Sequence, residues 1–239
     1  MQKYQNLSLL ALTETPDIII WPEYALPFDI ITQNKSLRET ISENIRKTNT
    51  PYIIGSMIFD PTTDYHENTA LFFDKHGQLK EYYSSILPLV FNRYAKNGTK
   101  GVTLLENAGV ALCWEEIDPS ILRTMTSKGA KYLIILSNEQ DLSRSWLLKF
   151  TSNFSKTRAS ENKRFVARAT NTGISQIIDP YGRILKQSPI CEANYLVKSI
   201  SLITEKTFYT LHGEIIIKII LFILCLLLLC RILKNKIYT

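Results

Sequence analysis

Short apolar runs recur along the chain and are separated by polar, turn-forming segments. The run DIIIW (Asp17–Trp21) is almost entirely apolar, which is typical of a strand buried on both faces, and YLIIL (Tyr132–Leu136) repeats the pattern. Further strands are predicted at Tyr52–Phe59, Thr69–Phe73, Val110–Cys113, Phe165–Ala169, Ser175–Asp179 and Ile184–Lys186.

Helix signals occupy the gaps between these strands. Ser36 with Glu39 three residues later predicts a capping box, and the apolar positions behind it are Leu37, Ile41 and Ile45. A second helix is expected after the N-cap and first-turn proline of Asp118-Pro119. A longer helix starts at about Ser145 and carries an aromatic stripe of Trp146, Phe150 and Phe154. Repeated strand–helix units of this kind predict an α/β layered fold.

The segment Ile215–Leu233 is apolar except for Lys218 and Arg231. About 20 such residues suffice to cross a bilayer, and a lysine one turn inside the end can snorkel. A buried core helix is the alternative, but such a helix is rarely apolar on every face. We therefore expect a domain at residues 1–214, a membrane span at 215–233 and a basic tail at 234–239. Positive charges after the span predict a cytoplasmic C-terminus and an outer domain, in a bacterium on the periplasmic side of the cytoplasmic membrane.

Composition narrows the function classes. Hydrophobic residues make up 45% and charged residues 21% of the 239 residues, as in an ordinary globular protein. Four of the net +6 charges fall at or after Lys218, which leaves the outer domain with +2. Basic residues are scattered among acidic ones, which argues against nucleic-acid binding. The four cysteines have no metal-type spacing, the three histidines lie far apart, and nucleotide-binding glycine motifs are absent, so no metal or cofactor is expected.

Two strand ends carry candidate chemistry. In Trp21-Pro22-Glu23 a strand leads directly into a carboxylate, whose pKa an apolar wall would raise toward that of a general base. On spacing alone, a Glu23 that faces solvent is the better interpretation. In Leu112-Cys113 a thiol ends a strand, where an inert buried cysteine is the commoner case and a nucleophile needs a neighbouring base.

Three segments, PDIIIWPEYALP, ALCWEE and RASENKRFVARATNTGISQIIDPYGRIL, together resemble the nitrilase superfamily, and most closely its membrane branch, the apolipoprotein N-acyltransferases. The resemblance runs from about Pro16 to Gly213. It implies an α-β-β-α sandwich with a Glu-Lys-Cys catalytic set. Glu23 matches the general base and Cys113 the nucleophile, while Glu115 matches a supporting acid and Trp114 replaces a tyrosine beside it. The segment 167–175 is assigned to packing.

The resemblance also implies an activity. Such enzymes transfer an acyl chain from a phospholipid donor to the N-terminal cysteine amine of an apolipoprotein acceptor at the bacterial membrane, through a thioester on the cysteine. A Glu would take the thiol proton and the thiolate would attack the ester, giving ping-pong behaviour. A membrane anchor would keep the site near its lipid donor.

Two departures predict impaired catalysis. The family's lysine motif falls on YSSILPLVFNRY, where Ser85 occupies the lysine position and Arg93 the position of a glutamate. Loss of one oxyanion donor typically lowers the rate by about 10²–10³, and Lys80 or Arg93 would be a weak substitute. The chain also starts about fifteen residues before the Glu23 strand, so we expect the family's opening strand and earlier membrane helices to be absent.

Three functions remain open from the sequence. The first is an N-acyltransferase that is truncated or split, with its N-terminal part elsewhere. The second is a catalytically inactive remnant or a membrane-anchored binding module that retains the sandwich. The third is a nitrilase-type amidase that carries an anchor.

Overall fold

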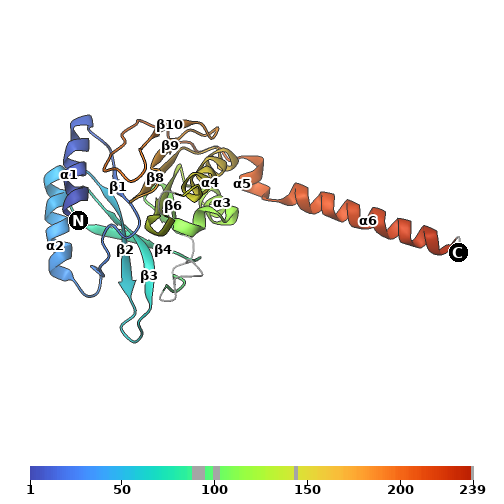
Figure 1. Ribbon diagram of the computed structural model, residues 1–239, viewed down its shortest axis with the longest axis horizontal. Coiled ribbons are helices and arrows are strands. Elements are labelled where there is room, and N and C mark those ends of the chain that lie inside the picture. Colours follow the sequence, from blue (N-terminus) through green and yellow to red (C-terminus); the bar gives the residue numbers. More distant parts are fainter. Residues whose placement is uncertain (88–94, 99–102, 143–144, 238–239) are drawn as a thin grey trace.

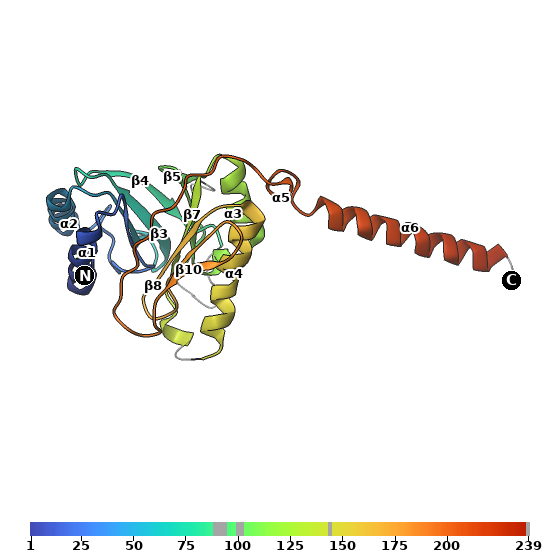
Figure 2. The same ribbon diagram turned by 90° about the horizontal axis from the view of Figure 1, so that it is seen from above.

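The computed structural model describes residues 1–87, 95–98, 103–142 and 145–237. Two β-sheets pack face to face, with helices on both outer sides (Figures 1 and 2). The first sheet has the order β1 (Ile19–Trp21), β2 (Tyr52–Phe59), β3 (His66–Phe73), β4 (Leu79–Ser84). The second has the order β10 (Ile184–Gln187), β9 (Gln176–Ile178), β8 (Val166–Thr170), β7 (Tyr132–Ser137), β6 (Ala108–Leu112), β5 (Leu104–Leu105).

The helices form the outer layers of the sandwich. The first sheet is covered by α1 (Gln2–Ala11) and α2 (Lys35–Thr48), and the second by α3 (Pro119–Ser127) and α4 (Leu147–Asn162) (Figure 1). Short 3₁₀ helices are η1 (Leu12–Glu14), η2 (Cys113–Glu116) and η3 (Gln140–Leu142). Beyond the sandwich, α5 (Phe208–His212) leads into α6 (Ile215–Ile237), which extends away from the domain (Figure 2). The expected α/β sandwich is confirmed.

The ends of several parallel strands lie together at one edge of the sandwich. In the first sheet β1 pairs in parallel with β2, and in the second β6, β7 and β8 are mutually parallel. The residues that follow β1, β6 and β7 therefore lie close together, although more than a hundred residues separate β1 from β7. This arrangement places the segment after Trp21 opposite the segment after Leu112.

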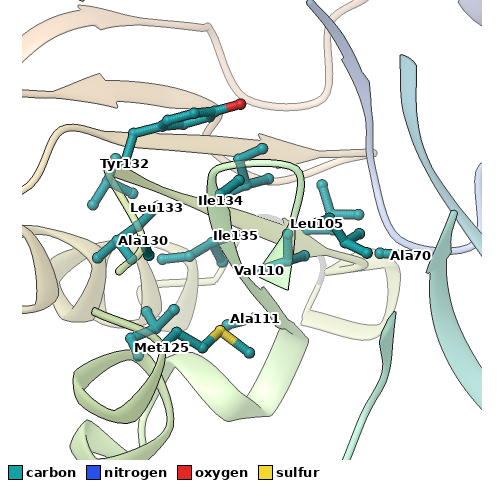
Figure 3. Packing of buried hydrophobic residues seen from close by; sticks show 14 of the residues in the cluster. Ala70, Leu105, Val110, Ala111, Met125, Ala130, Tyr132, Leu133, Ile134 and Ile135 are labelled. Atoms are coloured by element: carbon teal, nitrogen blue, oxygen red, sulfur yellow. The ribbon is translucent and has the colours of Figure 1, made fainter. Parts of the chain in front are cut away.

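Apolar side chains fill the space between the two sheets. Figure 3 shows this cluster, in which Ala70 belongs to the first sheet, Val110 and Ile134 to the second, and Met125 to α3. Each of these four side chains has lost all contact with solvent. The pattern predicted for YLIIL is confirmed, since β7 lies inside its sheet and is buried along its whole length. The prediction for DIIIW is confirmed only in part, because β1 begins at Ile19, lies at the edge of the first sheet and leaves Ile20 partly exposed.

Local signals at helix ends were only partly correct. Asp118 caps α3, because its carboxylate accepts a hydrogen bond from the Ser120 backbone N–H at 2.7 Å. The capping box predicted at Ser36 and Glu39 is wrong, since α2 begins at Lys35 and no side chain caps its first turn. Ser36 already lies within the helix, so its hydroxyl is not in the N-cap position.

Among the described residues, α6 is the one helix long and apolar enough to cross a membrane by length and composition. Its most apolar window, Ile215–Ile232, has a mean hydropathy of 3.0, and none of that window is buried against the domain. Apolar side chains exposed on every face are expensive in water and are the normal surface of a helix in lipid. The geometry is thus the one expected of a span.

Candidate active site

Glu23 lies directly after β1 and is buried between the sheets, with 3% of its surface exposed. The Asn68 side-chain amide donates to its Oε1 at 2.6 Å, and the Asn138 backbone N–H donates to its Oε2. Burial raises the pKa of this carboxyl from 4.5 to about 7, although its hydrogen bonds act in the opposite direction. The interpretation of Glu23 as a solvent-facing turn residue is therefore wrong.

A glycine on the neighbouring strand allows this close approach. A Cβ atom at Gly55 of β2 would overlap the Pro22 carbonyl group and the Cα of Glu23. Any larger residue would push the segment that carries the carboxylate away from the sheet. Tyr24, the next residue, adopts a φ of +51°, so the chain turns sharply just after Glu23.

Cys113 is the first residue of η2, immediately after β6, and its φ is +51°. A residue other than glycine rarely adopts this left-handed conformation, and such strain gathers at functional sites. The Glu23 carboxylate and the Ser137 side chain both lie close to the thiol and act on its pKa in opposite directions, Glu23 raising it and Ser137 lowering it. Burial raises the pKa of the Cys113 thiol well above its usual range, and the negative charge of Glu23 raises it further. The structure thus brings the Cys113 thiol and the Glu23 carboxyl together.

Glu115 is fully buried and acts as the centre of a hydrogen-bond cluster. Its donors are the Tyr83 hydroxyl (2.8 Å), the Ser85 hydroxyl (3.0 Å) and the backbone N–H groups of Ile86 (2.7 Å), Leu87 (3.3 Å) and Leu112 (2.8 Å). Burial raises its pKa, and the hydrogen bonds oppose that effect. This carboxylate therefore ties the end of β4 to the turn that carries Cys113. Trp114, in contrast, keeps 39% of its surface exposed.

Ser85 occupies the position where a lysine was expected, and it points at Glu115 rather than at solvent. Its hydroxyl can donate one hydrogen bond but carries no charge. Lys80 does not replace the missing cation, because its ammonium group pairs with Asp74 at 3.3 Å and is largely exposed. Arg93, the other cation considered from the sequence, lies outside the described residues.

A buried ion-pair network connects β8 to the 3₁₀ helix η2 that carries Cys113. The sequence patterns did not predict this network. The Arg168 guanidinium lies 2.9 Å from Glu116 and 2.8 Å from Glu139, and all three side chains are almost completely buried. A Cβ atom at Gly173 would overlap the Glu139 carboxylate. The available signal was a charged residue in the middle of an otherwise apolar strand, at Arg168.

The loop after β8 is connected to Glu23 through the segment that follows β7. Asn171 donates from its side-chain amide to Asn138 and accepts from the backbone N–H of Glu139 at 3.2 Å. Because the Asn138 backbone N–H donates to Glu23, this loop holds one of the hydrogen-bond donors of the Glu23 carboxylate. The assignment of 167–175 to packing therefore understated its part in the site.

Three further features lie outside the contacts between Glu23 and Cys113. His66 begins β3, is 9% exposed and is hydrogen-bonded to the Tyr24 hydroxyl at 3.1 Å. The described residues contain no group of three or more His, Cys, Asp or Glu side chains placed to hold a metal ion. A cavity of about 800 Å³ lies between α1, the edge of β1 and the segment 192–202, but neither Glu23 nor Cys113 lines it.

A family comparison agrees with this geometry. The model of the carbon-nitrogen hydrolase family matches residues 1–206, so the chain belongs to that family. Its fold is also that of solved family structures: an amidase from Nesterenkonia sp. (TM-score 0.65, 16% identity, 78% of each chain) and the C. elegans NitFhit protein (TM-score 0.66, 21% identity, 81% of this chain and 54% of the other). At such identities the likeness concerns the fold alone.

Curated relatives are named apolipoprotein N-acyltransferase. The protein from Chlorobaculum tepidum is 24% identical over 85% of this chain and 47% of its own length. The one from Rickettsia bellii is 27% identical over 92% of this chain and 49% of its own length. The chain thus spans about half the length of the curated relatives it matches, and the resemblance identified from the three sequence segments is confirmed.

Proposed function

We propose that this chain carries the catalytic pair of an apolipoprotein N-acyltransferase reaction, with Glu23 as general base and Cys113 as the nucleophile that forms the thioester. The single observation that carries the proposal is the buried Glu23 carboxyl beside the partly exposed Cys113 thiol, where the pKa of the carboxyl is about 7. A base with a pKa near ambient pH both accepts and returns a proton readily. The names of the curated relatives specify N-acylation of an apolipoprotein, which supports a lipoprotein amine as the proposed acceptor. A phospholipid is proposed as the acyl donor, as the family resemblance implies.

The proposed chemistry balances within this pair. Glu23 takes the proton of the Cys113 thiol, and the thiolate attacks the ester carbonyl of the phospholipid. The ester C–O bond then breaks, Glu23 returns the proton to the leaving alkoxide, and the acyl group stays on Sγ as a thioester. An acceptor amine next attacks the thioester, Glu23 removes the amine proton, and the C–S bond breaks to release the amide and the thiol.

The rate of thiolate formation is expected to be low. Ser85 supplies no positive charge, and the pKa of the Cys113 thiol is raised by burial and by Glu23. With serine in place of lysine, both the thiolate and the oxyanion lose electrostatic stabilisation, for which about 10²–10³ in rate per lost donor is typical. This observation favours a second candidate, a membrane-anchored module that retains the sandwich but no longer turns over.

The proposed location is the bacterial cytoplasmic membrane. The apolar helix α6 is proposed as its span, with the sandwich on the periplasmic side and the basic C-terminal residues in the cytoplasm. In that orientation the catalytic domain would face the compartment where lipoprotein termini are exposed after translocation.

A labelling experiment separates the two candidates. The full chain, reconstituted in vesicles that contain phosphatidylethanolamine with a labelled acyl chain, is expected to acquire a label that hydroxylamine removes. Cys113→Ala should abolish this label, whereas Cys191→Ala, at an exposed free cysteine, should retain it.

The Ser85→Lys variant tests the role of the missing charge. We expect its labelling rate to rise, by up to about 10²–10³ if the lysine restores the lost stabilisation. Absence of label from both the unmodified chain and Ser85→Lys would contradict the acyltransferase proposal and support the inactive module.

A further inference from the structure

The two faces of α4 have the reverse of the usual distribution of apolar residues. Its buried residues are Leu148, Thr151, Ser152, Ser155, Arg158, Ala159 and Asn162, of which five are polar. Its solvent side carries the aromatic stripe, with Trp146 71% exposed and Phe150 50% exposed. The rings contact one another, with centroids 5.8 Å apart for Trp146–Phe150 and 5.2 Å apart for Phe150–Phe154.

The polar inner face of α4 has a clear partner within the domain. Ser155 donates to Glu116 at 2.8 Å and Thr151 donates to Glu139 at 2.5 Å, so α4 satisfies the carboxylates of the buried Arg168 network. Within the described part of the chain, no comparable contact accounts for the aromatic residues on the outer face of α4. Two exposed aromatic rings and the partly exposed ring of Phe154 form this row. Such a contiguous apolar surface is unfavourable in water and commonly marks an interaction surface.

The position of α6 indicates what covers this surface. The Thr207 hydroxyl, just before α5, donates to the Glu161 carbonyl of α4 at 2.7 Å, and Thr210 of α5 donates to Asn162. The apolar helix α6 therefore starts beside the C-terminal end of α4. Figure 2 shows α4 running across the direction of α6, on the side of the second sheet from which α6 leaves. If α6 is perpendicular to a bilayer, α4 then lies along its surface.

We propose that the aromatic stripe of α4, Trp146, Phe150 and Phe154, lies in the headgroup region of the bilayer that α6 crosses. Because the buried residues of α4 face the domain, its aromatic side faces the same direction as α6. Trp and Phe are favoured at membrane interfaces, and the exposed Lys149 beside the stripe suits anionic lipid headgroups. The same helix holds the Arg168 network behind Cys113, so the site would stand a fixed distance from the lipid surface.

This inference rests on the proposed span and can be tested without any acyl transfer. The full chain is reconstituted in phosphatidylglycerol–phosphatidylcholine vesicles whose lipids are either plain or brominated near the carbonyl end of the acyl chains. Bromine quenches tryptophan only at close range. The emission of the unmodified chain minus that of Trp146→Phe reports Trp146 alone, separately from Trp21 and Trp114. We expect the brominated lipids to remove this difference emission and aqueous acrylamide to leave most of it.

A matched control places a tryptophan on the opposite side of the molecule. Phe28 is 49% exposed and lies between β1 and α2 in the sequence. Figure 1 shows β1 and α2 on the side of the sandwich opposite α6. Phe28→Trp in the Trp146→Phe background should show acrylamide quenching and no bromine quenching. Equal bromine quenching at both positions, acrylamide quenching of Trp146, or protection of Trp146 from both quenchers would each overturn the proposal, the last because a protein would then cover the stripe. Release of the chain from vesicles by alkaline carbonate would instead refute the span itself.

Discussion

Neutralising the buried carboxylate, by Glu23→Gln, should stabilise the fold at neutral pH while it removes the general base. The carboxyl titrates at about 7 in the folded chain and at 4.5 ordinarily, which corresponds to about 3 kcal/mol between its two protonation states. The folded state holds the proton more tightly than the unfolded state. The contribution of Glu23 to the free energy of unfolding is therefore at its most favourable below pH 4.5 and falls as the pH rises from 4.5 to 7. Above pH 7 it stays constant at its lower value.

Glutamine fits the hydrogen bonds of the site. Its carbonyl oxygen can accept from the Asn138 backbone N–H, as Glu23 does. Its amide can donate to Asn68 if that side chain turns over, because Asn68 Oδ1 is buried and has no hydrogen-bond partner. The neutral variant therefore avoids the desolvation of a charge without leaving a new buried donor unsatisfied.

The assay is thermal unfolding of the full chain in mild detergent between pH 4.5 and pH 7.5. The Tm of Glu23→Gln minus that of the unmodified chain should increase by roughly 6–12 °C across this range, at about 2–4 °C per kcal/mol. Glu39→Gln, on the exposed side of α2, controls for the loss of one carboxyl group. A Tm difference that stays constant with pH would refute the raised pKa of Glu23.

Two further variants test the supports of the site. Arg168→Met leaves two carboxylates buried without their cation, so we expect a loss of about 3–5 kcal/mol, seen as a lower Tm by circular dichroism. Arg183→Met removes a side chain that is 73% exposed in its ion pair with Asp179 and should cost less than about 1 kcal/mol, and an equal loss in both variants would contradict the network. Gly55→Ala should displace the backbone at Glu23 and slow iodoacetamide alkylation of Cys113 in the folded chain, as mass spectrometry would show. Unchanged alkylation would mean that the strand yields without moving the carboxylate.

Local sequence patterns determined the elements because their signals lie within a few residues of one another. The apolar runs specified β2 with its bounds Tyr52–Phe59, and Asp118-Pro119 specified the start of α3. The apolar length of the last helix was equally readable. Glu23 and Cys113 were singled out by their places at strand ends and, together, by the resemblance to a family.

Tertiary structure decided how those residues act, because the interactions concerned join distant parts of the chain. Asn138 donates to Glu23 across 115 residues, and no local pattern encodes that bond or the raised pKa that burial produces. The aromatic stripe of α4 illustrates the same limit. Helical spacing predicts that Trp146, Phe150 and Phe154 share a face, but not which way that face points. Here the inner side of α4 must satisfy buried carboxylates, so polar residues face the domain and the aromatic side faces outward.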